Sequence, residues 1–182
     1  SYTSVGAVSI ADYLKKEGWH VVYLPNRHAV RSNLEKYGDA ELIVYIGHGK
    51  RGQLVGQPPG PLVTEDTADV FADKVVLAIA CYGGTLGNAA MGAGARGYMG
   101  WMDVVYIGGI EVDHNYVADF MGTFLAAALE LAKGGSLRSA LNEFVAACEY
   151  YEDLYPKERY DFWDTYRALM RHNRVNVRIW TS

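Results

Sequence analysis

The chain has 182 residues, of which half are hydrophobic and 21% are charged, and its formal net charge is −4. This composition excludes an intrinsically disordered chain, and the length is enough for one domain that buries roughly 70% of the surface of its unfolded form. The acidic balance argues against nucleic acid as a partner, because phosphate binding usually needs a basic surface patch. The apolar runs are all shorter than the roughly 20 uncharged residues of a membrane span, so we expect no membrane partner.

The first half of the chain alternates predicted helices with predicted strands. Helical spacing of apolar residues predicts the helices, and short apolar runs predict the strands. After a loop over residues 1–7, we expect a helix over 8–18, a strand over 20–24, a helix over 28–39 and a strand over 41–46. This alternation predicts right-handed crossovers and a mostly parallel sheet. Such a sheet normally begins with a further strand, so we expect an upstream first strand or amino-terminal region outside this chain.

The second half continues the same pattern and ends mainly in helices. Residues 50–60 are rich in Gly, Gln and Pro, which predicts an exposed loop. The helices expected after it are 63–73, 85–94, 115–133, 136–152 and 156–172, and the strands are 74–80, 95–102 and 174–180. The fold class that we expect is therefore one α/β domain over residues 1–182, a three-layer sandwich with a mostly parallel central sheet.

Two of the predicted strands end in residues that carry chemistry. LIVYIGHGKRG, residues 42–52, has a His-Gly pair after an apolar run, and VVLAIACYGGTLGNAA, residues 75–90, has a cysteine in the same place. The carboxyl ends of the strands form the functional edge of an open α/β sheet. If the two strands are neighbours, His48 and Cys81 meet at that edge, where histidine supplies the base that a cysteine nucleophile needs. The sequence therefore predicts a Cys-His dyad.

Each residue of this dyad also has a simpler explanation. Cys81 alone would more often be a buried core thiol, and His48 alone an ordinary loop histidine. Their shared setting favours catalysis, because Gly47 and Gly49 flank His48, Gly83 and Gly84 follow Cys81, and glycine permits close backbone approach to a ligand. Acyl transfer also needs N–H donors for the developing oxyanion, and we expect them from the amides of Gly49 and Cys81. Cys81 would then attack the carbonyl, and His48 would protonate the leaving amine.

The histidine and the cysteine lie in the segments VYIGHG and LAIACYGG, 33 positions apart (81 − 48). This arrangement resembles the clan CD cysteine peptidases, which include caspases, legumain, gingipains, separase and CHAT-domain proteases. The stretch NAAMGAGARGYMGWMDVVY and the later helix pair are similar to CHAT and gingipain-like domains, so the resemblance covers most of residues 42–151. It implies a caspase-haemoglobinase fold and an endopeptidase with His48 as general acid/base, Cys81 as nucleophile and Gly49 as an oxyanion donor. Ala80 and Tyr82 depart from the pattern, which leaves a catalytically degenerate protein-interaction domain as the alternative.

The resemblance also bears on substrates and partners. The substrate would be a protein or peptide, and family members are often switched by a regulatory partner or an upstream domain. An acidic pocket near the dyad would select Arg or Lys before the scissile bond, and we expect Asp103 or Asp113 to supply it. Trp101 could form a pocket wall that packs on the aliphatic stem of the substrate residue. The simpler explanation of each acid is a solvated acidic loop.

Other chemistries fit the sequence less well. His48, Cys81, Asp113 and His114 include zinc-binding residue types, but no CxxC or HxxxH spacing is present, so we expect no metal and no cofactor. Glutamine amidotransferases place their histidine after the cysteine, whereas here it precedes. Cys148 shares an apolar helix face with Leu141 and Phe144, which predicts a core position. The two distant cysteines predict no disulfide framework and favour a reducing compartment such as the cytoplasm.

Overall fold

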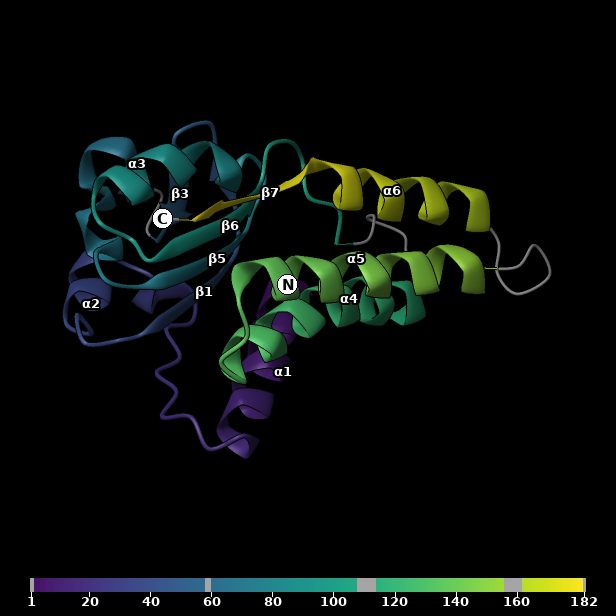
Figure 1. Ribbon diagram of the computed structural model, residues 1–182, viewed down its shortest axis with the longest axis horizontal. Helices are drawn as coiled ribbons and strands as arrows, with labels where there is room; N and C mark the ends of the chain where they lie inside the picture. The colour runs from purple at the N-terminus through teal and green to yellow at the C-terminus, as the bar shows by residue number, and fades with distance from the viewer. Residues whose placement is uncertain (1, 58–59, 108–113, 156–161, 182) are drawn as a thin grey trace.

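A four-stranded sheet forms the centre of the protein and has helices on both faces (Figure 1). The computed structural model describes residues 2–57, 60–107, 114–155 and 162–181. In spatial order, the strands of this sheet are β1 (Leu42–Ile46), β5 (Val75–Ile79), β6 (Gly97–Trp101) and β7 (Val177–Thr181). The first three are parallel, and β7 is antiparallel to β6. The prediction of an α/β fold with a mostly parallel sheet is therefore confirmed.

The two faces of the sheet bury two separate cores. Leu77 and Ile79 of β5 belong to the larger core, whereas Val76 and Ala78 belong to the smaller one, and all four are fully buried. A strand that is covered on both faces needs apolar side chains at every position rather than at alternate ones. This requirement explains the uninterrupted apolar run that precedes Cys81.

Long helices cover the larger core, and short elements cover the smaller one. The long helices α4 (His114–Ala132) and α5 (Leu137–Leu154) lie on one side of the sheet, and α3 (Gly87–Gly92) lies on the other (Figure 1). The remaining helices are α1 (Tyr2–Lys16), α2 (Arg31–Glu35) and α6 (Trp163–Asn176), and 3₁₀ turns span Asn26–His28, Glu65–Phe71 and Gly83–Leu86. The arrangement is consistent with a three-layer α/β fold.

A second, smaller sheet follows His48, where the sequence predicted an exposed loop. It consists of β2 (Gly49–Lys50), β3 (Gln53–Gly56) and β4 (Gly60–Thr64), paired antiparallel in that order. Gly52 makes the turn between β2 and β3 at φ 68°, a left-handed conformation that glycine adopts readily. Leu54 and Val63 are paired across the sheet and are 1% and 0% exposed. The composition of this segment is typical of loops, but these two apolar side chains anchor it in the smaller core.

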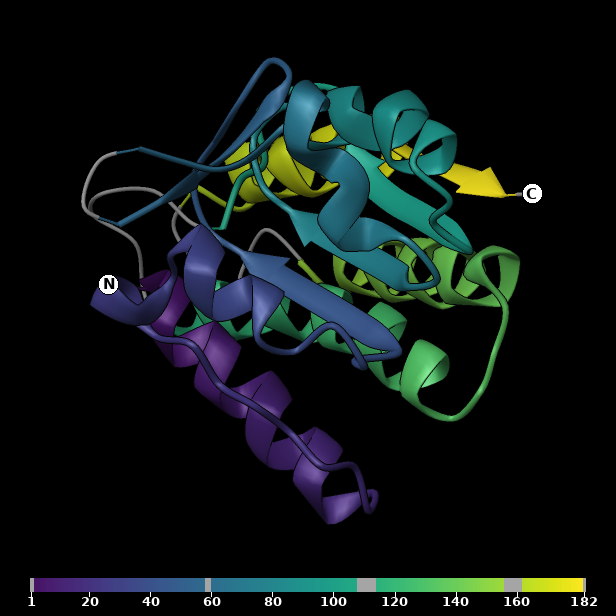
Figure 2. The same cartoon turned by 90° about the vertical axis from the view of Figure 1, so that its left-hand side faces the viewer.

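Two expectations for the amino-terminal part are wrong. Residues 2–7 belong to α1 instead of a loop, and residues 20–24 form no strand, so β1 is the edge of the sheet within the described residues. Trp19 packs against the larger core instead, and its indole N–H donates to the Ala132 carbonyl at 2.8 Å. Figure 2 shows α1 and the chain that follows it on the β1 side of the molecule. An apolar run becomes a strand only where it can pair with the edge strand of a sheet. The local sequence does not show whether such an edge strand lies nearby.

Candidate active site

The strands β1 and β5 are parallel neighbours that end at the same edge of the sheet. Ile46 pairs with Ile79, so His48 and Cys81 each lie two positions beyond the last paired residues. The Gly47 N–H continues the ladder by donating to the Ile79 carbonyl at 3.2 Å. Gly49 packs so closely on the Cys81 carbonyl oxygen that a Cβ at this position would clash with it. The structure therefore brings the two predicted residues to adjacent strand ends.

The backbone of His48 is held firmly, whereas its side chain is exposed. The His48 carbonyl accepts from the Val55 N–H at 3.0 Å and lies 2.7 Å from the Tyr45 hydroxyl, which is also 2.8 Å from the Val55 carbonyl. Burial raises the pKa of Tyr45 to about 12, so this hydroxyl stays a neutral donor at physiological pH. Among the contacts of the described residues, no hydrogen bond joins the His48 ring to the Cys81 sulfur. Catalytic hydrogen bonds are often long without substrate and tighten when it binds.

Cys81 is a free, partly exposed cysteine at the end of β5. Its Sγ accepts a hydrogen bond from the Val105 N–H at 3.4 Å. An N–H group that points at a sulfur atom favours negative charge on it. The sulfur therefore lies at the solvent edge of the sheet and has a backbone donor on one side.

Side-chain contacts join the turn after Cys81 to the small sheet. Tyr82 adopts a left-handed conformation, with φ 56°, and the Arg51 guanidinium lies 5.0 Å from the centre of its ring. The Thr85 hydroxyl accepts from the Gly52 N–H at 2.7 Å and donates to the Tyr82 carbonyl at 2.7 Å. These contacts hold the segment after His48 against the segment after Cys81.

Within the described residues, the two amides expected to bind an oxyanion have no backbone carbonyl as acceptor. Because the His48 carbonyl faces β3, the alternation of an antiparallel strand turns the Gly49 N–H away from β3. Within the described residues, no backbone carbonyl accepts from the Cys81 N–H. The contacts of the described residues therefore leave both N–H groups without a backbone carbonyl partner.

Trp101 does not lie where a substrate could contact it, which corrects the expectation of a pocket wall. Its side chain is 0% exposed, and its ring packs at 5.2 Å from Phe124 of α4 and at 5.2 Å from Phe144 of α5. Its indole N–H donates to the Asn173 carbonyl at 2.9 Å. The tryptophan lies on the face of β6 that the long helices cover, so it belongs to the larger core.

Asp103 lies beside the turn that carries Cys81. Its carbonyl accepts from the Tyr82 N–H at 3.0 Å, and its side chain is 46% exposed. One carboxylate oxygen accepts from the Val104 N–H at 2.8 Å, and the other lies 4.0 Å from Nε2 of His172. The backbone of Asp103 thus contacts the cysteine turn, and its carboxylate lies beside Val104 and His172. The second predicted acid, Asp113, lies outside the described residues.

Several residues of this region were not predicted from the sequence. Tyr45 supports the His48 turn, Thr85 joins the two halves of the site, and His172 and Asn173 come from α6. Tyr45 is the one residue of β1 with a polar group, in the run LIVYI, which offers a weak signal. The residues of α6 are close to Cys81 only because β7 returns the chain to the sheet beside β6, and no local pattern indicates that contact.

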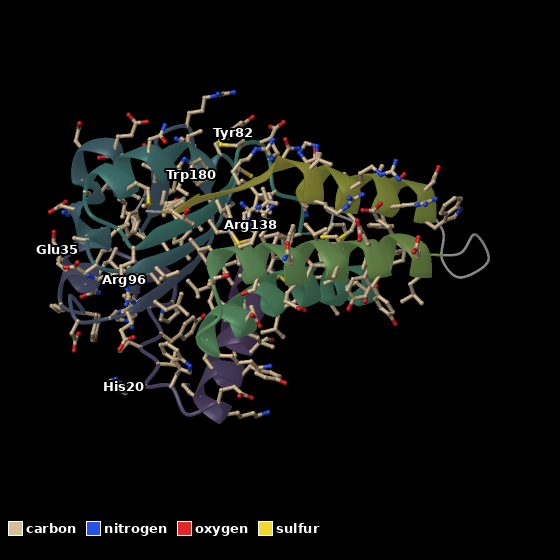
Figure 3. All side chains as sticks on the ribbon, in the orientation of Figure 1. His20, Glu35, Tyr82, Arg96, Arg138 and Trp180 are labelled. Carbon is tan, nitrogen blue, oxygen red and sulfur yellow. The ribbon has the colours of Figure 1, made fainter. Side chains whose placement is uncertain are left out.

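A cavity of about 530 Å³ lies away from this region, at the amino ends of the strands. Its lining includes Glu41, Leu42 and Val75, and the Arg96 side chain donates to the Glu41 carbonyl at 3.1 Å. Figure 3 labels Tyr82 and Arg96 at opposite ends of the sheet. The candidate site therefore lies beyond the carboxyl ends of β1 and β5 and is separate from this cavity.

Comparison with protein-family models, with curated proteins and with solved structures found no match for this chain. Within the described ranges, no three His, Cys, Asp or Glu side chains are grouped so that they could hold a metal ion. In the same part of the chain, none of the helices combines the length and apolarity needed to cross a membrane.

Proposed function

We propose that this chain is a cysteine endopeptidase of the clan CD type, with a caspase-like sheet and a dyad of His48 and Cys81. One observation carries the proposal. The neighbouring parallel strands β1 and β5 end in register, two positions before the histidine and the cysteine. The contact of Gly49 with the Cys81 carbonyl supports it further, because it keeps the two turns at close range.

The reaction follows from the groups at this edge. The Cys81 thiolate adds to the carbonyl carbon of the scissile peptide, and the N–H groups of Gly49 and Cys81 stabilise the oxyanion. The protonated His48 donates to the amide nitrogen, the C–N bond breaks, and the amine leaves behind a thioester on Cys81. Neutral His48 then takes a proton from a water molecule, whose oxygen attacks the thioester. The C–S bond then breaks, the acid product leaves, and the Cys81 thiolate and protonated His48 are regenerated.

Asp103 is the residue that we propose to select the substrate. Its backbone carbonyl accepts from the N–H of Tyr82, one residue from the nucleophile, and its carboxylate is half-exposed. A Lys or Arg side chain before the scissile bond would form a charge-assisted hydrogen bond with it. The expected preference is therefore for a basic residue at that position.

The test uses peptidyl acyloxymethyl ketones, in which a cysteine thiolate displaces the acyloxy group. One peptide carries Arg or Lys next to the reactive ketone and a second carries Asp, and peptide mass spectrometry locates the adduct. We expect the basic peptide to label Cys81, and we expect His48→Ala to abolish this labelling. Cys148 of the same chain is the internal control, because it is buried.

Two results would contradict the proposal. Equal labelling of Cys81 in the parent and in His48→Ala would show that the reactivity of Cys81 does not depend on His48. An absence of labelling by either peptide, together with equal binding of a partner by the parent and by Cys81→Ala, would favour the catalytically degenerate interaction domain. Labelling by the Asp peptide alone would contradict only the role of Asp103.

A further inference from the structure

The chain beyond β6 runs past Cys81 with its backbone anchored at successive residues. This 103–106 segment begins after Met102, whose N–H donates to the Asn176 carbonyl at 2.9 Å. The Asp103 carbonyl accepts from the Tyr82 N–H, and the Val105 N–H donates to the Cys81 sulfur. The segment is thus bonded to the cysteine turn at two points.

Asn173 of α6 holds the far end of the 103–106 segment. Its side-chain amide bonds both backbone groups of Tyr106: the oxygen accepts from the Tyr106 N–H at 2.9 Å, and the nitrogen donates to the Tyr106 carbonyl at 2.7 Å. Its own carbonyl accepts from the indole of Trp101, the last residue of β6. Asn173 is 0% exposed. One buried residue therefore fixes the chain on both sides of the segment that faces Cys81.

The neighbouring residue of α6 supports the same segment. Nε2 of His172 lies 3.1 Å from the Val104 carbonyl, and its ring packs edge-on against Tyr106 with ring centres 5.1 Å apart. The carbonyl of His172 accepts from the side chain of Asn176, which does not reach the segment. Asn176 therefore offers a matched control residue in the same turn of helix.

We propose that Asn173 is a positioning residue for Cys81, because it holds the 103–106 segment so that the Val105 N–H points at the sulfur. The inference deepens the proposed peptidase and rests on it for its catalytic meaning. A hydrogen bond to a charged group contributes enough for its loss to change a population by about 10-fold or more. Loss of Asn173 therefore slows the reaction of the Cys81 sulfur with an electrophile at neutral pH.

The test measures the rate at which iodoacetamide alkylates Cys81 from about pH 6 to about pH 9.5, where thiols ordinarily gain reactivity. The proteins are the parent, Asn173→Ala and the control Asn176→Ala. We expect Asn173→Ala to react about 10-fold more slowly at neutral pH and to need a higher pH for the same rate. Asn176→Ala is expected to match the parent.

Two features keep this experiment decisive. Alkylation of Cys148 in the same samples reports unfolding, because that thiol is buried. If Asn173→Ala unfolds, Val105→Pro removes the same N–H group directly and is expected to slow alkylation equally. The other charged or titratable groups around the turn, His48, Arg51, Asp103 and His172, are unchanged in every variant, so a difference between profiles is due to the segment.

The outcomes separate this proposal from the proposed function. Equal alkylation profiles of the parent and of folded Asn173→Ala or Val105→Pro would overturn the positioning role, even if the protein cleaves peptides. A profile that depends on Asn173, in a protein that no peptidyl ketone labels, would support the positioning role and contradict the peptidase.

Discussion

The two cysteines of this protein lie in regions that give the same side chain opposite properties. Cys81 lies two residues beyond the carboxyl end of β5, is partly exposed and accepts a hydrogen bond from a backbone N–H at its sulfur. Cys148 lies on the inner face of α5 with 0% exposure, and burial raises its pKa to about 12. The comparison shows that reactivity follows from where an element ends and which face it buries, because both determine whether a thiolate can be solvated.

The two regions are also held together by different forces. Around Cys148, apolar burial dominates, with Phe124 and Phe144 stacked at 5.6 Å between ring centres. Around Cys81, backbone and side-chain hydrogen bonds join the turns, as at Thr85. We therefore expect changes near Cys148 to affect mainly the free energy of unfolding, and changes near Cys81 to affect mainly chemistry.

The largest expected effect is on catalysis. Removal of the nucleophile in Cys81→Ala should lower the initial rate of cleavage of a peptide with Arg or Lys before the scissile bond by at least about 1000-fold. Cys148→Ala should retain activity, because its thiol is buried away from the strand edge. Equal activity of the parent and Cys81→Ala would remove the proposed distinction between the two cysteines.

The next largest effect is on the core beside Cys148. Phe144→Ala should lower the free energy of unfolding by about 3–5 kcal/mol, because it removes a fully buried ring and leaves a cavity. Urea denaturation measures the loss. Phe162→Ala is the control, because Phe162 is 73% exposed, and it should change stability by less than about 0.5 kcal/mol. Similar losses in both variants would contradict the assignment of Phe144 to the core.

A smaller effect is a pH dependence that originates in Cys148. The folded-state pKa of about 12 lies above the usual thiol value of about 8.5, so the folded chain keeps a proton that the unfolded chain loses. The stabilisation is fully present below about pH 8.5 and is lost as the pH rises toward about 12. Near pH 10, the parent should have lost about 2 kcal/mol more of its unfolding free energy than Cys148→Ala, each relative to neutral pH. If the unfolding free energies of the two proteins change in parallel with pH, the proposed contribution of Cys148 is wrong.

The smallest effect is expected where hydrogen bonds join the two turns of the candidate site. Thr85→Val removes the hydroxyl that bridges Gly52 and Tyr82 and should cost about 1 kcal/mol of stability. It should also slow labelling of Cys81 by the peptidyl ketone. Thr165 is exposed, so Thr165→Val provides the control for the same chemical change. Thr85→Val with the stability and labelling rate of that control would mean that the bridge does not hold the site.

The sequence alone determined the elements whose signals are local. Apolar runs ended by glycines predicted the strands at β1 and β5, and with them the positions of His48 and Cys81 at strand ends. The apolar face of α5 predicted the burial of Cys148. These predictions succeed because burial on both faces of a sheet, or on one face of a helix, leaves a periodic pattern in neighbouring residues.

Only the tertiary structure decided which distant residues meet. The contact between Trp101 and Asn173 joins positions 72 residues apart, and the one between Val105 and the Cys81 sulfur joins positions 24 residues apart. The same long-range packing buries Trp101 and leaves residues 20–24 without a strand partner. Such contacts depend on how β7 and α6 return to the sheet. The residues next to a side chain in the sequence do not indicate which distant residue the fold will place against it.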